Sequence, residues 1–395
     1  MTHEARSADA CAAAVVRTRG AARWTRRLHP WIYQSDVIEA PGTAGVVRVL
    51  DERGSVIGMA LASPVSTIAL RMLTHDERPI DASFWNERIA RAAAYRSGLT
   101  IHANAYRLVH AEADGLPGLI VDRYGPFLAV QFLTAGVEVY RADIAAALDE
   151  QLRPAGILAR DDVPIRRHER LGGGIHVVSG EVPDEAEVEE AGIRFLVALR
   201  AGQKTGAFLD QRENRVRAGQ LSHGRALDCF SYHGSFALHL ARGATTVTAV
   251  DSSSDALERA QRNAQLNGFT NIEFLEANVF ELLRSLEAAN QRFDMIVLDP
   301  PAFAKSKQSV TTALRGYKEI NLRAMRLLAP GGHLCTFSCS YHVGRARFDD
   351  MLAKAAADAG RPLRWLEWRG QAADHPGAVQ IPESSYLKGA VLEAL

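Results

Sequence analysis

A regular alternation of short apolar runs with helical stretches in the second half of the chain is the strongest constraint on its fold. The apolar runs are ALDCF, TVTAVD, IEFLEA, MIVLD and HLCTFS, and helices are expected between them near residues 235–242, 254–267, 279–288 and 312–328. Strands that alternate with helices predict a parallel sheet covered on both faces. A further helix at FDDMLAKAAADAG and a strand at SYLKGAVLEAL complete an α/β domain predicted for residues 186–395.

The first half of the chain has a different pattern. Residues 1–85 contain short β-rich runs punctuated by glycine and proline, which predicts a small barrel. A helix is expected at 83–98, followed by mixed strands and helices, so residues 86–185 are predicted to form an α+β domain. The acid-rich segment 181–192 is the best candidate for a linker.

Composition excludes several protein classes. The 395 residues carry a net charge of zero and four cysteines without a CxxC pair, which argues against a disulfide framework or a metal site. No apolar run is long enough to cross a bilayer, so a cytoplasmic, unexported protein is expected. With no global positive charge, any surface for nucleic acid must be local.

Two basic segments could provide such a surface. The first runs from Arg17 to Arg27 and ends in the aromatic HPWIY, which includes Trp31. Cations beside aromatic rings suit looped or single-stranded RNA, although a solvated first strand explains these residues equally well. The second is RAGQKTGAFLDQRENR, where cations surround Phe208 and Asp210. Phosphate contact and ordinary surface charge are both open for its three cations, Lys204, Arg212 and Arg215.

The carboxyl ends of the predicted parallel strands are where ligands bind in such sheets. The first strand ends near Asp228, with Gly234 at the turn into the next helix, and the second ends in Asp251, placed to bind a ribose diol. A nucleoside-containing cofactor is therefore expected. The GxGxxG pattern of dinucleotide sites is absent, since Tyr232 replaces its first glycine, and S-adenosylmethionine has less need of a phosphate cradle. Ser231, Ser235, Phe236 and Ser252 lie in the same two loops.

The fourth strand ends in VLDPPAF. Asp299 followed by Pro300 and Pro301 predicts a rigid wall at the mouth of the site, with Phe303 close behind. In adenosylmethionine enzymes, this is where a planar nitrogenous target is held. A simple turn at the end of a strand is the alternative.

Two cysteines stand at the end of the fifth strand. Strand periodicity puts Cys335, Phe337 and Cys339 on one face. Cys335 lies within the apolar run and is expected to pack in the core, as is Cys229, whereas Cys339 should emerge at the sheet edge facing Asp299. A thiolate there can add to C6 of cytosine and so activate C5 for methylation, which methylation of nitrogen does not require.

In these motifs the chain resembles the bacterial large-subunit ribosomal RNA cytosine-C5 methyltransferases that carry an N-terminal PUA domain. The resemblance rests on RRLHPWIY, EADGLPGLIVDRYG, GQKTGAFLDQRENR, LDCFSYHGSF, VLDPPAF, RGYKEIN, FSCS, RGQAADHP and YLKG, in this order along almost the whole chain. It implies a PUA-type RNA-binding barrel, a central α+β domain and a class I (Rossmann-like) methyltransferase domain, in a homodimer that acts on ribosomal RNA with S-adenosylmethionine.

The resemblance also assigns residues. Cys339 matches the nucleophile of the family and Asp299 the acidic residue at the cytosine edge. Motifs that line the cofactor pocket contain Phe208, Asp210, Tyr232, Gly234 and Asp251. Before Val279, where an acidic residue commonly contacts adenine, this chain has Asn278, whose amide oxygen can still accept a hydrogen bond.

The resulting hypothesis is a ribosomal RNA cytosine-C5 methyltransferase, with His342 as a guess for the group that promotes the Cys339 thiolate. The candidate substrate contacts are Arg27, Trp31, Lys204, Arg212, Pro301 and Phe303, and no metal is expected. Two alternatives stay open: an RNA N-methyltransferase of the same fold, and an RNA-binding ribosome-assembly factor without activity. The sequence does not identify the methylated nucleotide, the base that takes the C5 proton, the form of RNA that is the substrate or the dimer interface.

Overall fold

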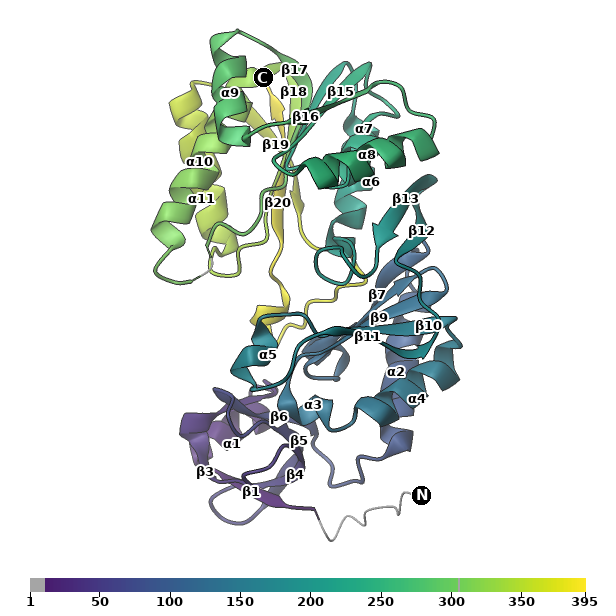
Figure 1. Cartoon of the computed structure of the whole chain (residues 1–395). Helices are drawn as coiled ribbons and strands as arrows, with labels where there is room; N and C mark the ends of the chain where they lie inside the picture. Colours follow the sequence, from purple (N-terminus) through teal and green to yellow (C-terminus); the bar gives the residue numbers. More distant parts are fainter. Residues whose placement is uncertain (1–10, 305) are drawn as a thin grey trace. The chain divides into compact units, whose positions relative to one another are not determined.

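The computed structural model describes residues 11–304 and 306–395, which form two compact units (Figure 1). The first unit contains the described residues up to 188, together with residues 197–209 and 373–384. The second unit contains residues 189–196, 210–372 and 385–395. The chain therefore crosses between the units several times.

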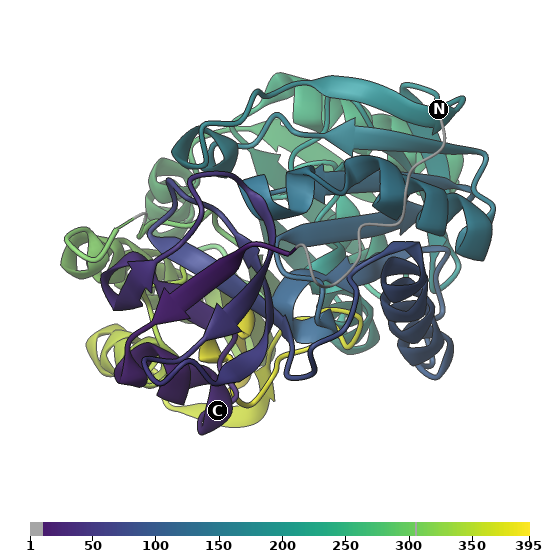
Figure 2. The same cartoon turned by 90° about the horizontal axis from the view of Figure 1, so that it is seen from below.

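The first unit begins with a six-stranded sheet in the order β2-β6-β5-β4-β1-β3, whose purple strands lie together in Figure 2. Its strands are β1 (Ala13–Val16), β2 (Trp31–Tyr33), β3 (Val37–Glu39), β4 (Gly45–Leu50), β5 (Val56–Ala62) and β6 (Ile68–Thr74). The basic segment forms helix α1 (Thr18–Thr25), so the alternative of a solvated first strand is wrong. A 3₁₀ turn, η2 (Gln34–Asp36), follows β2.

A five-stranded sheet, in the order β11-β10-β9-β8-β7, follows in the same unit. It contains β7 (Ala105–His110), β8 (Leu119–Tyr124), β9 (Phe127–Phe132), β10 (Gly156–Arg160) and β11 (Ile175–Gly180). The expected helix is α2 (Ala82–Ser97), and its N-cap Asp81 accepts a hydrogen bond from the amide of Phe84. The other helical elements are η3 (Ala111–Asp114), α3 (Ala135–Glu138), α4 (Arg141–Leu152) and α5 (Ile165–His168).

The segment expected to be a linker does contain the first passage from one unit to the other, at residues 188 and 189, but it forms regular structure, which the prediction did not foresee. β12 (Glu185–Glu190) pairs with β13 (Ile193–Ala198). Along β12 burial alternates, and Ala186, Val188 and Glu190 point inward. The alternation of buried and exposed residues was not recognised in the sequence, because the segment is rich in acidic residues and one of its buried positions is itself a glutamate.

The second unit contains a seven-stranded sheet in the order β16-β15-β14-β17-β18-β20-β19. Its strands are β14 (Arg225–Cys229), β15 (Thr246–Asp251), β16 (Ile272–Glu276), β17 (Phe293–Leu298), β18 (Leu328–Ser338), β19 (Leu363–Arg369) and β20 (Lys388–Ala394). β14 to β18 are parallel, whereas β20 is antiparallel to both of its neighbours. The five predicted parallel strands and the C-terminal strand are all present.

Helices cover both faces of this sheet (Figure 1). They are α6 (Arg212–Leu221), α7 (Ser235–Leu240), α8 (Ser254–Leu266), α9 (Val279–Ala288), α10 (Val310–Leu327) and α11 (Arg345–Ala359). Successive residues of one strand serve opposite cores: Leu227 packs with α9, α10 and α11, and Ala226 packs with α6 and α7. The expected N-cap of α8 is confirmed, since Ser253 Oγ accepts from the amide of Ala256.

Two short turns mark places where the chain crosses between the units. η4 (Leu209–Gln211) leads into α6, and η5 (Pro382–Ser384) lies between β19 and β20. Within the first unit, the guanidinium of Arg96 donates to the carbonyl oxygen of Asp374 at 2.7 Å. The amide of Arg107 donates to the Asp374 carboxylate at 2.7 Å. These buried contacts hold Asp374, which lies in the part of the RGQAADHP motif that belongs to this unit, against α2 and β7.

Candidate active site

The carboxyl ends of the five parallel strands bring Asp228, Asp251, Asn278, Asp299 and Cys339 to one edge of the seven-stranded sheet. β14 pairs in parallel with β15 on one side and β17 on the other, and Cys229 lies opposite both Val250 and Leu298. The strand order reverses at β14, because the chain moves outward to β16 and then returns to β17. Such a reversal opens a crevice for ligands beyond the strand ends.

Asp228, near the end of β14, is fully buried. One carboxylate oxygen accepts from Ser231 Oγ at 2.6 Å and from the amide of Ala237 at 2.9 Å. The other, Oδ1, has no hydrogen-bond partner among the described residues. Burial raises the pKa of Asp228 to about 7, with a smaller contribution from the negative charges of Asp299 and Asp251. A buried acceptor without a partner is costly, so it favours a ligand that donates a hydrogen bond.

The loop after β14 turns sharply before α7. Phe230, Tyr232 and Gly234 all have positive φ, at 65°, 52° and 83°. A Cβ at Gly234 would lie 2.9 Å from the Cβ of Ala260, so the glycine permits both the turn and the close approach of α8. Ser235 and Phe236 are buried in the first turn of α7.

Asp251, at the end of β15, connects the first two loops. Its Oδ2 accepts from the amide of Tyr232 at 2.8 Å and its Oδ1 from the amide of Ser253 at 3.0 Å. The residue is half-buried, and the neighbouring Ser252 is exposed. The carboxylate is therefore oriented by backbone groups at the edge of the sheet, where the sequence predicted it.

Asn278 has a structural role that the sequence analysis did not anticipate. It is the N-cap of α9, and its side-chain oxygen accepts from the amides of Phe280 at 2.9 Å and Glu281 at 3.4 Å. The side-chain oxygen of Asn278 that caps the helix is the same oxygen that was expected to accept a hydrogen bond from adenine in place of an acidic residue. Val279, the next residue, is buried.

Asp299 begins the loop after β17 and is held by a residue that the sequence analysis missed. Gln211 Nε2 donates to Asp299 Oδ1 at 2.8 Å, and Gln211 Oε1 in turn accepts from Asn214 Nδ2 at 2.5 Å. Gln211 stands within the GQKTGAFLDQRENR motif, but nothing in its spacing indicates a contact with a residue 88 positions away.

The loop that follows Asp299 contains a buried Pro300, an exposed Pro301 and a half-buried Phe303. The ring of Phe303 packs against that of Tyr317 on α10, with centroids 4.6 Å apart. Tyr317 is fully buried, and its hydroxyl lies 2.8 Å from Ser340 Oγ. This network joins the loops that leave β17 and β18.

Cys339 lies directly beside this loop. Its Sγ is 4.0 Å from the carbonyl oxygen of Pro300, with the geometry of a thiol donor. Cys335, Phe337 and Cys339 pack in one cluster, which confirms the shared face, and Cys335 is buried whereas Cys339 is half-buried. The position of Cys339 opposite the Asp299 loop is therefore as the sequence predicted.

The other three cysteines have surroundings that disfavour a thiolate. Burial raises the pKa of Cys335 to about 12 and raises the pKa of Cys229 well above its ordinary value. Burial also raises the pKa of Cys11, whose thiol donates to the carbonyl of Val46. Both sheet-core cysteines are packing residues, as expected.

The cations of the second basic segment divide between the two units. Lys204 lies in the first unit, with its Nζ 4.5 Å from the ring centroid of Phe208. Arg212 and Arg215 lie in the second and are buried, so the surface-charge interpretation was wrong for both. Arg215 forms an ion pair with the buried Glu190, which makes it an architectural residue.

Asp210, in the second unit, is also buried. The hydroxyl of Tyr386 donates to its Oδ2 at 2.6 Å, and its carbonyl oxygen accepts from the amide of Ala372 at 2.9 Å. Tyr386 belongs to the YLKG motif, for which the sequence analysis gave no role. These bonds connect the start of α6 with the segments just before and just after residues 373–384, which belong to the first unit.

In the first basic segment, some arginines are exposed and others form ion pairs. Arg26 and Arg27 are exposed just beyond α1, whereas Arg19 and Arg23 are paired with the buried Asp36. Trp31 is half-buried, and its indole nitrogen donates to Glu112 at 2.9 Å. A cavity of about 610 Å³ opens in this unit; its lining includes Trp24, His75, Arg88, Arg91, Tyr95 and Asp114.

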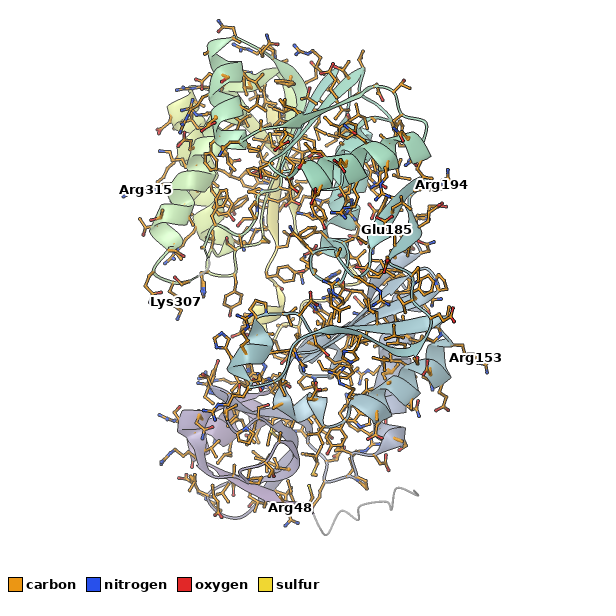
Figure 3. The ribbon with its side chains drawn as sticks, in the orientation of Figure 1. Arg48, Arg153, Glu185, Arg194, Lys307 and Arg315 are labelled. Atoms are coloured by element: carbon orange, nitrogen blue, oxygen red, sulfur yellow. The ribbon has the colours of Figure 1, made fainter. Side chains whose placement is uncertain are left out.

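The residues of the RGYKEIN segment on α10 differ in their exposure to solvent. Figure 3 shows Arg315 pointing away from the sheet, and this residue is exposed. Lys318 is paired with Asp358 on α11 at 2.6 Å, while Tyr317 and Asn321 are buried. Over residues 11–304 and 306–395, no cluster of three or more potential metal ligands occurs and no helix is long and apolar enough to cross a membrane.

The sheet order and the loops beyond its strands define the class of protein as a methyltransferase of the Rossmann-like type. The family model described as S-adenosylmethionine-dependent methyltransferase matches residues 151–379, and that of a PUA-like domain matches 16–75. The relative named ribosomal RNA large subunit methyltransferase I from Aeromonas hydrophila is 41% identical over 394 residues, covering 97% of this chain and 99% of its own. Its namesake from Tolumonas auensis is 43% identical over 381 residues, covering 93% and 96%.

Solved structures agree on the fold. SMU.776, named as a methyltransferase and solved in complex with SAH, superposes with a TM-score of 0.84 at 20% identity, covering 96% of this chain and 99% of its own. The chain therefore belongs to the S-adenosylmethionine-dependent methyltransferases with an N-terminal PUA-like domain, in the family of the relatives named ribosomal RNA large subunit methyltransferase I. The predicted fold class and cofactor are confirmed.

Proposed function

We propose that this protein methylates C5 of a cytosine in large-subunit ribosomal RNA, through a covalent bond between Cys339 and C6 of the base. The observation that carries the proposal is the 4.0 Å approach of Cys339 Sγ to the Pro300 carbonyl. It brings a half-buried thiol beside the loop that follows Asp299. The names of the relatives, which specify ribosomal RNA of the large subunit, support the substrate.

The residues at the sheet edge fit S-adenosylmethionine, which supplies an electrophilic methyl group on a sulfonium when bound. The buried Asp228 Oδ1 needs a hydrogen-bond donor, and a cationic amino group nearby would also offset the cost of its charge. Asp251 presents a half-exposed carboxylate suited to a ribose diol. We assign Ser231, Tyr232, Gly234, Ser235, Phe236, Ser252, Asn278 and Val279 to the walls of the same site.

Cys339 has a defined part in this chemistry. Its thiolate adds to C6, and the electrons of the C5–C6 double bond make C5 nucleophilic enough to take the methyl group. Loss of the C5 proton to water or to an unidentified base then restores the double bond, and the C6–sulfur bond breaks to return the thiolate. Methylation of a nitrogen would need no such addition, since a lone pair is already present.

Asp299 would orient the polar edge of the cytosine through N3 or N4. Gln211 Nε2 donates to one of its carboxylate oxygens at 2.8 Å and so helps to orient the carboxylate. Pro300 and Pro301 limit the movement of this loop, and Phe303, packed on Tyr317, offers an aromatic face. A flipped base can be held in such a site at a cost of a few kcal/mol for unstacking.

RNA binding is assigned to the PUA-like part of the chain. Arg26 and Arg27 are exposed beside its first helix, as phosphate contacts must be. Trp31 and Lys204 remain proposed contacts, although Trp31 is also bound to Glu112. Arg212 also remains a proposed contact, although it is buried. A homodimer acting in the cytoplasm, and domain boundaries near residues 85 and 185, belong to the same proposal.

The decisive experiment compares wild type with Cys339→Ala on undermethylated large-subunit RNA and labelled S-adenosylmethionine, followed by identification of the methylated base. Label on C5 of cytosine that depends on Cys339 supports the proposal. Label on a nitrogen, or full activity of Cys339→Ala, would favour an N-methyltransferase. RNA binding by a protein that shows no S-adenosylmethionine binding in a titration would instead favour an assembly factor.

A further inference from the structure

Lys388 is a buried cation close to Cys339 that no step described so far uses. It begins β20, directly opposite Ser338 at the end of β18. The residue is 5% exposed. Its Nζ donates to the carbonyl oxygens of Ser340 and Tyr386, at 2.7 Å each. The ammonium group is thus bound to the residue that immediately follows Cys339.

Within the described part of the chain, Lys388 has no carboxylate as a counter-ion. Among the described residues its hydrogen-bond acceptors are these two neutral carbonyls, and no carboxylate lies within ion-pair distance of its Nζ. Burial lowers the pKa of Lys388 to about 8, the negative form of Cys339 opposes this shift, and the positive charge of Arg345 adds to it. A buried charge normally needs a partner of opposite sign. The Cys339 thiolate is the negative group that can supply it.

We propose that the Lys388 ammonium group stabilises Cys339 as a thiolate, and so prepares the sulfur for addition to cytosine. The inference rests on the proposed function, in which Cys339 is the nucleophile. Lys388 acts through Cys339 and not on the base. The thiol proton passes to water, Lys388 keeps its three protons, and the thiolate formed again when the C6–sulfur bond breaks returns to the same ammonium group.

Lys388 is a better candidate than His342, which the sequence suggested as the group that promotes the thiolate, because Lys388 is bonded to the residue next to Cys339. The ring of His342 packs against that of Tyr341, with centroids 5.2 Å apart, and this is its only ring or polar contact within the described residues. Arg345 is committed to the backbone, since it donates to the carbonyl oxygens of Gly389 and Arg369. Lys388 is therefore the better candidate for the thiolate's cation.

Charged and titratable groups from each neighbouring element also act on Cys339. Tyr317 on α10 is bonded to Ser340, and its pKa is raised mainly by burial, with a smaller contribution from Cys339. The negative charge of Asp299, one residue before Pro300, would oppose a thiolate at Cys339, and the positive charge of Arg345 on α11, which lowers the pKa of Lys388, would favour one. Tyr386 precedes β20 and offers Lys388 its carbonyl. The predicted pH dependence must therefore be measured against variants that alter Lys388 alone.

The test measures how fast iodoacetamide alkylates Cys339 in the full-length protein as a function of pH, with the modified peptide quantified by mass spectrometry. Alkylation follows the thiolate fraction and needs neither RNA nor methyl transfer. Variants are Lys388→Met, Lys388→Arg, which keeps the charge, and Lys354→Met, which removes an exposed cation on α11. Cys11 serves as the internal reference in every sample.

We expect Lys388→Met to slow alkylation of Cys339 near neutral pH by about tenfold or more, because an adjacent opposite charge shifts a pKa by roughly one to three units. Lys388→Arg should retain most of the wild-type rate, and Lys354→Met all of it. An unchanged pH profile in Lys388→Met would overturn the proposal. So would a wild-type midpoint at or above that of an ordinary thiol, about 8.5, which can be measured even if the methionine variant does not fold.

This readout separates the inference from the proposed function. If Cys339→Ala methylates RNA normally, Cys339 is not the nucleophile and the proposed mechanism fails, whatever the alkylation shows. If Cys339→Ala is inactive but Lys388→Met alkylates like wild type, the mechanism stands and the role of Lys388 fails. Lower methylation by Lys388→Met with rescue by Lys388→Arg, together with the shifted alkylation profile, supports both.

Discussion

The edge of the seven-stranded sheet and the surface around α1 are both rich in polar side chains, but they hold them differently. At the sheet edge, Asp228 is oriented by hydrogen bonds from the loop and helix that follow its own strand, and Asp251 and Asp299 by hydrogen bonds from other segments. Beside α1, Arg26 and Arg27 are exposed. The first arrangement suits chemistry, which depends on fixed geometry. The second suits binding to a polyanion, where each cation adds a small and salt-dependent amount.

The largest expected effect is at the sheet edge. Cys339→Ala should lower methylation by about a thousandfold or more, since removing a covalent nucleophile abolishes its pathway. Cys335→Ala, on the same face of the same strand, should keep the reaction and lower the free energy of unfolding by about 1 kcal/mol. Rates of methyl transfer and chemical denaturation would measure the two effects. Comparable methylation by both variants would contradict the distinction between the cysteines.

A buried ion pair and an exposed ion pair should differ in how much they contribute to the free energy of unfolding. Glu190→Gln should lower the free energy of unfolding by about 3–5 kcal/mol, because it leaves Arg215 charged and buried without its partner. Arg48→Gln breaks an exposed pair with Glu77 in the six-stranded sheet and should cost about 1 kcal/mol or less. Denaturant unfolding at neutral pH gives both values, and a larger loss from Arg48→Gln would reverse the expected order.

Glu190 also predicts acid sensitivity. The charge of Arg215 and its hydrogen bonds lower the pKa of Glu190 from 4.5 to about 2, although burial acts in the opposite direction. A carboxyl whose folded pKa is depressed contributes stability above its unfolded pKa, and this contribution is lost as pH falls from about 4.5 toward 2. Glu190→Gln should therefore lose less stability than wild type over that range. Parallel unfolding curves of the two proteins across it would contradict the assignment.

Asp228 should respond in the opposite direction. Burial raises its pKa from 3.8 to about 7, so the folded protein binds the proton more tightly than the unfolded chain. Its contribution is therefore favourable at low pH and is lost as pH rises from about 4 to 7, by a few kcal/mol. Asp228→Asn should remove this dependence, which thermal unfolding across the range would measure. Saturating S-adenosylmethionine should weaken the dependence in wild type if its amino group lies near Asp228.

The smallest effects are expected at the surface beside α1. Arg26→Gln and Arg27→Gln should each weaken RNA binding a few-fold and lower the salt dependence by roughly 0.7 to 1 in log–log slope. Arg153→Gln, an exposed cation after α4 that is labelled in Figure 3, is the matched control and should change neither. Filter-binding titrations at several salt concentrations provide the comparison. A loss equal to that of the control would remove these arginines from the RNA surface.

Much of the sheet edge was predictable because it depends on local order in the chain. Alternation of strands and helices predicted the parallel sheet, and residues directly after a strand must emerge at its carboxyl edge. Strand periodicity placed Cys335 and Cys339 on one face, and position along the strand separated them. The failures were residues whose environment depends on distant partners: phosphate contact and surface charge were both left open for Arg215, and no strand was predicted in the acid-rich segment 181–192, where the buried Glu190 pairs with Arg215.

By itself, the sequence determined the order of elements, the loops that carry the chemistry and the family, since these follow from periodicity and from motifs that are local in the chain. Only the tertiary structure decided which partners hold those loops in place. Gln211 reaches Asp299 from 88 positions away, and Lys388 reaches Ser340 from 48 positions away. Hydrogen bonds and ion pairs act over a few ångströms in space regardless of separation along the chain, so the environment of Cys339 could be seen only after β18 and β20 were paired.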